Sequence, residues 1–200
     1  MALKFYDISQ EVFSCAVYPG DPAPKREVLC TINDAALYNL TAFSMCAHNG
    51  THIDAPSHFL RDGSTIEQIP LEKTMGIAFV ASHDGDVTAA DAQNILQRAE
   101  KAHAEAAKKI LLKGKAIVTI EAAEVFAGAN IDLIAVESQT VGPEDAPMAV
   151  HLALLKKGVV LLEGVRLHEV SEGAYFLSAA PLALGGADGA PCRAVLTTLA

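Results

Sequence analysis

Short apolar runs alternate with longer mixed segments through the middle of the chain. The runs are rich in Ile, Val and Leu, as buried strands are, and cover 109–112, 131–136 and 159–163. Helices are predicted for the mixed segments over 88–108, 119–127 and 146–157, and the first of them is rich in Ala, Glu, Gln, Lys and Arg. Thr88 stands three residues before Asp91, which is a typical helix N-cap pattern. The alternation of strand and helix predicts an α/β fold.

The two ends of the chain have a different pattern, with strand-like segments separated by Gly and Pro. These segments cover 3–8, 26–32, 175–179 and 193–198. The stretch 18–22 reads Tyr-Pro-Gly-Asp-Pro, which predicts a loop. We expect these outer strands to extend the central ones into a mixed sheet with flanking helices. At 200 residues, and with no linker that would divide it, the chain is expected to form a single domain over 1–200.

Composition narrows the range of partners. Fifteen Lys and Arg stand against 24 Asp and Glu, giving a formal net charge of -9, which argues against a nucleic-acid partner. No run of 18 apolar residues or signal-peptide pattern is present, so we expect no membrane contact and a cytoplasmic location. The four cysteines form no CxxC pair, which argues against a zinc knuckle.

The strongest chemical signal is a cluster of histidines around one aspartate. His48, His52, Asp54 and His58 fall within the eleven residues His-Asn-Gly-Thr-His-Ile-Asp-Ala-Pro-Ser-His. On an extended backbone, His52 and Asp54 point to the same side. Asn-Gly before them and Pro after them allow the chain to turn, so that all four side chains can converge. Imidazole and carboxylate groups are usual zinc or manganese ligands, so the cluster predicts a metal site.

The same eleven residues resemble the HxGTHxDxPxH motif of the metal-dependent cyclase or hydrolase superfamily, which includes bacterial kynurenine formamidase and isatin hydrolase. The loop 18–21, the segment 151–164 and the closing segment 181–193 also look like family features. The resemblance implies a swivelling β/β/α-like fold. It implies a hydrolase that cleaves a C–N bond of a small amide, a formamide or a cyclic amide, and a homodimer.

The resemblance also implies a ligand set. A distal histidine and a glutamate twelve residues later complete the family's site, and His151 and Glu163 have that separation. His48, His52 and Asp54 would hold one divalent ion, and Asp54, His151 and Glu163 would help to hold a second. We thus expect one or two zinc or manganese ions per chain.

His58 is the candidate catalytic residue, as the general base and acid of the hydrolysis. Its sequence position leaves open whether it is a metal ligand instead. His168 is kept as a weaker candidate for supporting the site, because it lies close to Glu163 in the sequence.

Substrate recognition is where the chain departs from the family pattern. The formamidases carry a tryptophan before the Pro-Gly-Asp loop, whereas this chain has Tyr18 and no tryptophan. A phenol hydroxyl needs a hydrogen-bond partner, so Tyr18 predicts a smaller or more polar small-molecule substrate. Segment 136–142 also differs, reading Val-Glu-Ser-Gln-Thr-Val-Gly.

Two other classes of function stay open at this point. A non-catalytic metal-binding or ligand-binding protein of the same fold would keep every ligand, and turnover would distinguish it from an enzyme. An interaction protein would need no metal, and its stability would not change on metal removal.

Overall fold

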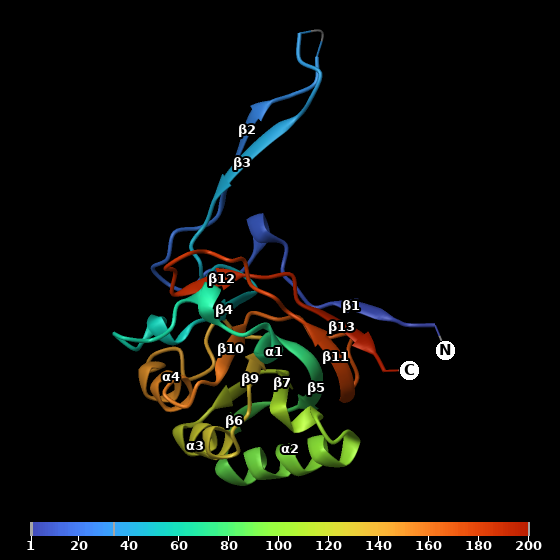
Figure 1. Cartoon of the computed structure of the whole chain (residues 1–200), viewed down its shortest axis with the longest axis vertical. Helices are drawn as coiled ribbons and strands as arrows, with labels where there is room; N and C mark the ends of the chain where they lie inside the picture. Colours follow the sequence, from blue (N-terminus) through green and yellow to red (C-terminus); the bar gives the residue numbers. More distant parts are fainter. Residues whose placement is uncertain (1, 34, 200) are drawn as a thin grey trace.

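The computed structural model describes residues 2–33 and 35–199. Its main body is a nine-stranded mixed sheet that carries helices, and a two-stranded hairpin projects from it (Figure 1). The order of strands across the sheet is β1 (Phe5–Asp7), β13 (Val195–Thr198), β11 (Gly173–Ser178), β5 (Met75–Ser82), β7 (Lys109–Lys113), β9 (Leu133–Val136), β10 (Val160–Glu163), β4 (His52–Asp54) and β12 (Gly189–Pro191).

The centre of the sheet is parallel and its two sides are antiparallel. Strands β5, β7, β9 and β10 run parallel, and such neighbours need crossover connections. The crossovers contain α2 (Ala89–Ala102), α3 (Ile120–Gly128) and α4 (Met148–Leu155), while the one-turn α1 (Leu71–Thr74) precedes β5. A small parallel pair, β6 (Gly85–Val87) and β8 (Ala116–Val118), lies beside the sheet. The α/β class with a mixed sheet and flanking helices is thus confirmed.

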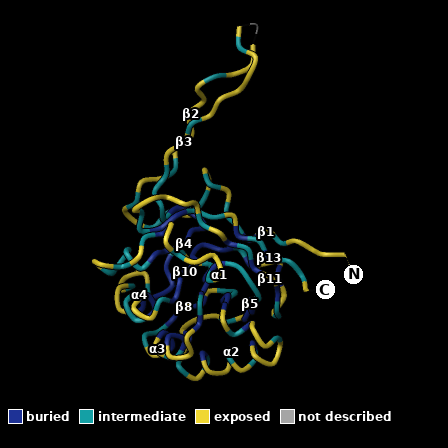
Figure 2. The backbone as a smooth tube through the Cα atoms, in the orientation of Figure 1, coloured by how far each residue is buried: buried dark blue, intermediate teal, exposed yellow. Residues whose placement is uncertain are grey.

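Alternate residues of the central strands face two separate apolar layers. Ile110, Leu112 and Ile134 pack under the helices with Phe126 of α3. The residues between them, such as Leu111, point to the opposite layer. This two-residue period is the expected one for strands covered on both faces. Figure 2 shows the resulting buried centre, with exposed residues along the outer helix faces.

The hairpin consists of β2 (Lys25–Cys30) and β3 (Leu40–Ser44), which pair only with each other among the described strands. It stands away from the body on the side opposite α2 and α3 (Figure 1). Residues just outside its two strands, Asp21 before β2 and Cys46 after β3, return to the body and line a cavity there. The sequence predicted the first of these strands, over 26–32, but neither the second strand nor the projection of the pair from the body.

Two other element predictions need correction. The helix expected over 88–108 ends at Ala102, and a separate 3-10 turn covers Ala106–Lys108; its start is as predicted, with Thr88 and Asp91 forming a capping box. Strand β5 was not predicted, although it is the longest strand of the sheet. No helix of the described residues has the length and apolar character needed to cross a bilayer.

Candidate metal and hydrolytic site

The site begins with the pairing of two short strands. Strands β4 and β10 are antiparallel, with His52 opposite Glu163 and Asp54 opposite Leu161. Because side chains alternate along a strand, Ile53 enters the apolar layer, while His52 and Asp54 share the other face with Glu163. The turn before β4 contains Gly50 with φ +65°, the left-handed conformation expected of the Asn-Gly pair.

Helix α4 adds His151 to this face. Its Nε2 lies 3.3 Å from Glu163 Oε1 and 3.5 Å from Asp54 Oδ2. His52 Nε2 similarly lies 3.4 Å from Asp54 Oδ1 and 3.5 Å from Glu163 Oε2. All four residues are at least 97% buried. Two imidazoles and two carboxylates are therefore enclosed together, away from solvent.

The other ring nitrogens decide how the histidines face the carboxylates. His52 Nδ1 lies 3.0 Å from the Gly50 carbonyl oxygen, and His151 Nδ1 lies 2.9 Å from that of Pro147. A carbonyl oxygen only accepts, so each Nδ1 must donate. In a neutral ring, Nε2 then turns its lone pair towards the carboxylates. That arrangement needs a positive charge between them, either a proton or a metal cation.

The raised pKa values of His52 and His151 also indicate that a positive charge is needed between these histidines and the carboxylates. Burial by itself lowers the pKa of His52, but the Asp54 and Glu163 carboxylates outweigh it and raise the pKa to about 10. The same opposition, burial against Asp54 and Glu163, raises the pKa of His151 to about 10. Asp54 Oδ2 accepts no hydrogen bond from the described residues. These donors suit a divalent cation, which would take the place of the extra protons.

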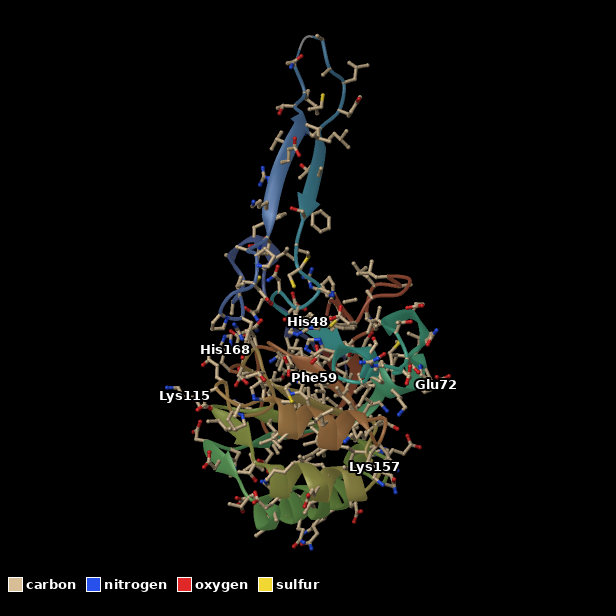
Figure 3. The ribbon with its side chains drawn as sticks, turned by 90° about the vertical axis from the view of Figure 1, so that its left-hand side faces the viewer. His48, Phe59, Glu72, Lys115, Lys157 and His168 are labelled. Atoms are coloured by element: carbon tan, nitrogen blue, oxygen red, sulfur yellow. The ribbon has the colours of Figure 1, made fainter. Side chains whose placement is uncertain are left out.

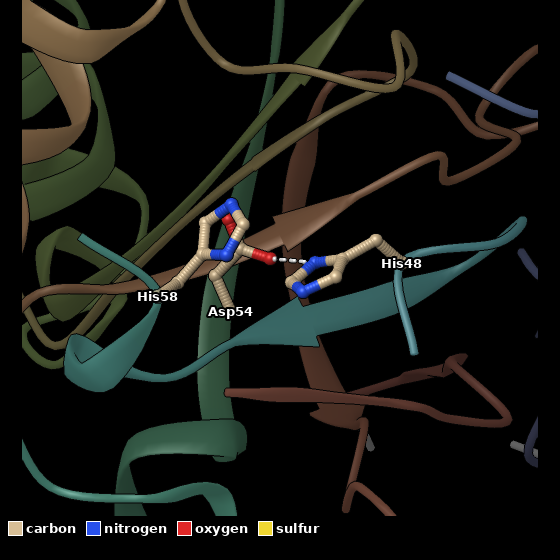
Figure 4. A group of neighbouring side chains, drawn as sticks. All are labelled: His48, Asp54 and His58. Atoms are coloured by element: carbon tan, nitrogen blue, oxygen red, sulfur yellow. Dashed lines mark hydrogen bonds and ion pairs between the residues drawn. The ribbon is translucent and has the colours of Figure 1, made fainter. Parts of the chain in front are cut away.

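A second group of side chains meets at the same aspartate. His48 Nδ1 lies 2.8 Å from Asp54 Oδ1, as Figure 4 shows, and its Nε2 lies 3.1 Å from Asp188 Oδ2. His58 Nδ1 also lies 3.1 Å from Asp188 Oδ2. Burial opposes protonation of His48, but Asp54 and Asp188 raise its pKa. Candidate ligand atoms of His48, Asp54 and His58 lie within 4.8 Å of one another.

The six predicted metal and catalytic residues therefore lie together, with Asp54 shared by two groups. The grouping differs from the one expected from the resemblance, because His52 joins His151 and Glu163, while His48 joins His58. The register between β4 and β10 explains this difference, since it places His52 directly opposite Glu163. Asp54 belongs to both groups, and its place between two ions stays a prediction.

Five of these six side chains, all except Asp54, line a cavity of about 430 Å³. Phe59 and Tyr18 contribute aromatic walls. Tyr18 does line the cavity, but its hydroxyl donates to the Glu144 main-chain carbonyl at 2.8 Å. The hydroxyl therefore has a partner within the chain and does not require a polar substrate. The preference for a smaller or more polar substrate stays a prediction.

Three other polar residues of the cavity were missed from the sequence. Asp188 contacts both His48 and His58. A usable signal was its position in the Gly-rich segment 185–189, directly before Gly189. In the structure an added Cβ on Gly189 would lie 2.7 Å from His48 Cε1. Gln139 and Thr140 come from the loop after β9. The amide of Gln139 and the buried hydroxyl of Thr140 have no hydrogen-bond partner within the described chain.

His168 does not belong to the site. Its side chain is 76% exposed and lies 3.9 Å from Glu169, on the outside of the molecule (Figure 3). Its closeness to Glu163 was a closeness in sequence only. Strand β10 ends at Glu163, and in the segment that follows Val165 and Leu167 are buried in the core while His168 faces the surface.

Comparison with known proteins places these observations in context. The Cyclase family model, described as "Putative cyclase", matches residues 6–143. Kynurenine formamidase of Bacillus cytotoxicus is 32% identical over 99% of both chains, and that of Delftia acidovorans is 30% identical over the full length of both. A solved structure described as a potential metal-dependent hydrolase with cyclase activity has a TM-score of 0.81 at 29% identity, covering all of both chains. Isatin hydrolase A of Ralstonia solanacearum shares the fold, with a TM-score of 0.84 at 21% identity over 98% of this chain and 92% of its own.

Proposed function

The chain belongs to the cyclase family, and from this premise we propose that it is a metal-dependent hydrolase that cleaves the C–N bond of a small amide, a formamide or a cyclic amide. The observation that supports the proposal most directly is a buried set of two histidines and two carboxylates. His52, His151 and Glu163 line a substrate-sized cavity, and Asp54 lies against both histidines. Relatives that cover the whole chain are named kynurenine formamidase, which supports amide hydrolysis. The alternative of a non-catalytic binding protein is therefore not favoured.

The donor set fits a divalent ion. His52, Asp54, His151 and Glu163 would hold one ion, and His48 with the shared Asp54 would help to hold a second. Bound there, a divalent cation supplies hydroxide from water at neutral pH and polarises the amide carbonyl. Imidazole and carboxylate ligands suit zinc and manganese alike, and we propose one or two of these ions per chain.

His58 is proposed to move the proton. Its Nδ1 faces Asp188 Oδ2, a carboxylate that can only accept, so Nδ1 carries a hydrogen and Nε2 is left available as a base. Its side chain is 28% exposed at the cavity, so a substrate can approach it. We assign to Nε2 the removal of a proton from water and its return to the leaving nitrogen. Asp188 fixes the ring and its tautomer.

Gln139 and Thr140 are proposed to recognise the amide. The unpaired side-chain amide of Gln139 offers an oxygen that accepts and a nitrogen that donates. These two groups match the N–H and the C=O of a substrate amide. Burial without a partner is costly for such groups, so a substrate that pairs them gains affinity. Tyr18 and Phe59 would provide apolar contact area.

Metal analysis combined with turnover tests this function. Protein from metal-replete growth is assayed for bound zinc and manganese and then for hydrolysis of formamides, lactams and lactones. We expect bound metal and turnover of at least one amide, both lost on chelation and regained on metal addition. Metal-loaded protein that hydrolyses none of these compounds would count against the enzyme and leave the binding protein.

Three expectations stay predictions: that residues 1–200 form one hydrolase domain, that the protein is cytoplasmic, and that it works as a homodimer.

A further inference from the structure

Gln10 lies outside the cavity but is hydrogen-bonded to segments that carry two of the proposed metal ligands. Its side-chain Nε2 donates to the Gly164 main-chain oxygen at 2.8 Å, and its Oε1 accepts from the Ala16 main-chain nitrogen at 2.7 Å. Its own main-chain N–H donates to Thr51 Oγ1 at 2.9 Å. One residue near the amino terminus thus contacts positions that lie 41 and 154 residues further along the chain.

The first of these segments directly follows a proposed ligand. Gly164 comes immediately after Glu163, where β10 ends and the chain turns with φ +71°. The Gly164 carbonyl oxygen accepts two hydrogen bonds, from Gln10 Nε2 and from Thr51 Oγ1, each at 2.8 Å. A carbonyl oxygen has two lone pairs, so this oxygen is fully paired. The peptide that follows Glu163 is therefore held in one orientation.

The second segment is the turn before β4. Gly50 donates its main-chain N–H to the Ala16 oxygen at 3.1 Å, and the Gly50 oxygen accepts from His52 Nδ1 at 3.0 Å. Gln10 joins this chain of contacts through the N–H of Ala16. Consecutive hydrogen bonds therefore lead from the Gln10 side chain to the ring nitrogen that decides which way His52 turns its Nε2.

The two turns are packed directly against each other. An added Cβ on Gly164 would lie 2.3 Å from the Gly50 oxygen and 2.6 Å from Gln10 Nε2. An added Cβ on Gly50 would lie 2.9 Å from Cys15 Cβ. Because the packing is this close, a shift of one turn moves the other. Gln10 is not among the described residues that line the cavity, so any effect it has on the site passes through these turns.

We propose that Gln10 is a positioning residue that holds His52 and Glu163 in the relative placement that a divalent ion requires, an inference that rests on the proposed metal site. Groups hydrogen-bonded around metal ligands orient them, and loss of such a group lowers metal affinity by about 10- to 100-fold. A glutamine suits this place because its amide donates and accepts at once. An apolar side chain of similar size would lose both bonds.

The first test measures zinc affinity of the full chain in competition with a chelator of known affinity. Gln10→Leu removes both side-chain bonds, whereas Gln10→Glu keeps the acceptor for Ala16 and loses the donor to Gly164. We expect each variant to bind zinc about 10- to 100-fold more weakly than wild type. Gln97→Leu, at an exposed position of α2, is the matched control and should bind zinc as wild type does. Zinc affinities of both Gln10 variants equal to that of the control would overturn the proposal.

The second test separates positioning from a general loss of stability. Nitrogen-15 NMR of the zinc-loaded protein follows the imidazole protons on Nδ1 of His52 and of His151, whose own acceptor is the Pro147 oxygen at the start of α4. In Gln10→Leu the His52 proton should exchange with water about tenfold faster or more, while the His151 proton is unchanged. Equal acceleration of both protons, or of neither, would overturn the proposal.

Neither measurement depends on turnover, so the two proposals fail in different ways. A wild-type chain that binds no zinc would remove the metal site and the positioning role together. Tight zinc binding by wild type and by both Gln10 variants would overturn the positioning role and leave the hydrolase proposal as it stands.

Discussion

Asp188 gives the sharpest test of the proton-transfer assignment, because it reaches the proposed base without belonging to the sequence motif. Its Oδ2 lies 3.1 Å from His58 Nδ1 and 3.1 Å from His48 Nε2. Asp188→Asn keeps the shape but removes the charge and can leave His58 in the wrong tautomer. A hydrogen bond to a charged group contributes about 1.5–3 kcal/mol, and the 50% exposure of Asp188 reduces this through solvent screening to about 1–1.5 kcal/mol.

A loss of that size corresponds to a decrease in kcat of roughly tenfold. His58→Ala should cost about a hundredfold or more, with most of the metal retained. If Asp188 acts through His58, the double variant should be no slower than His58→Ala alone. The assay is kcat on the best amide found, with metal content measured on every variant, and Asp86→Asn serves as the control for an exposed aspartate on β6. The assignment would be refuted if the kcat losses of the two single variants multiplied in the double variant. It would also be refuted if the Asp188→Asn enzyme were as fast as the Asp86→Asn control.

Four further outcomes are expected. Asp54→Ala should lose most of the bound metal, since both groups of donors share this carboxylate. Elemental analysis measures the metal content, and full retention of metal would disprove that Asp54 serves both groups. Gln139→Leu should lower kcat/KM for an amide by about tenfold or more in steady-state assays, because it removes an unpaired amide that we assign to substrate binding. An unchanged kcat/KM would show that Gln139 does not recognise the substrate. Tyr18→Phe should change kcat/KM by less than about threefold, because the lost hydroxyl bonds to the main chain; a larger loss would reinstate it as a substrate contact. Gly164→Ala should sharply lower the midpoint temperature of thermal unfolding. Gly164 has φ +71°, and an added Cβ would lie 2.3 Å from the Gly50 carbonyl oxygen. The control Gly128→Ala on α3, where the space around the residue is open, should be neutral or stabilising.

The sequence predicted most of the helices and central strands because their signals are local. The N-caps of α2 and α3 and the apolar runs of β7, β9 and β10 depend on residues a few positions apart. Strand β5 has a similar apolar run, Gly-Ile-Ala-Phe-Val-Ala, so its sequence carries the same local signal although no strand was predicted there. The projection of the hairpin has another cause: the strand pattern of 26–32 is the same whether the strand packs on the body or stands away from it.

The site shows the same division between local and distant information. The spacing of His52 and Asp54 is enough to put them on one face of a strand, and the motif drew attention to His48 and His58. Which carboxylate meets which histidine depends on the register between β4 and β10, whose residues are more than a hundred positions apart. Pattern alone cannot supply such a register, so the side chains are grouped differently from the expected arrangement. Which of them hold which ion stays a prediction.

The register also explains why the six residues form one site. Strand β10 lies between β9, to which it is parallel, and β4, to which it is antiparallel, so its carboxyl end meets the loop after β9 and the amino end of β4. Glu163 at that end accepts from the Val141 main chain at 2.8 Å, which fixes the loop that carries Gln139 and Thr140. One carboxylate thus connects the proposed metal ligands to the proposed substrate contacts. Loss of Glu163 should therefore disturb both metal binding and recognition, whereas loss of His48 should leave the loop that carries Gln139 and Thr140 in place.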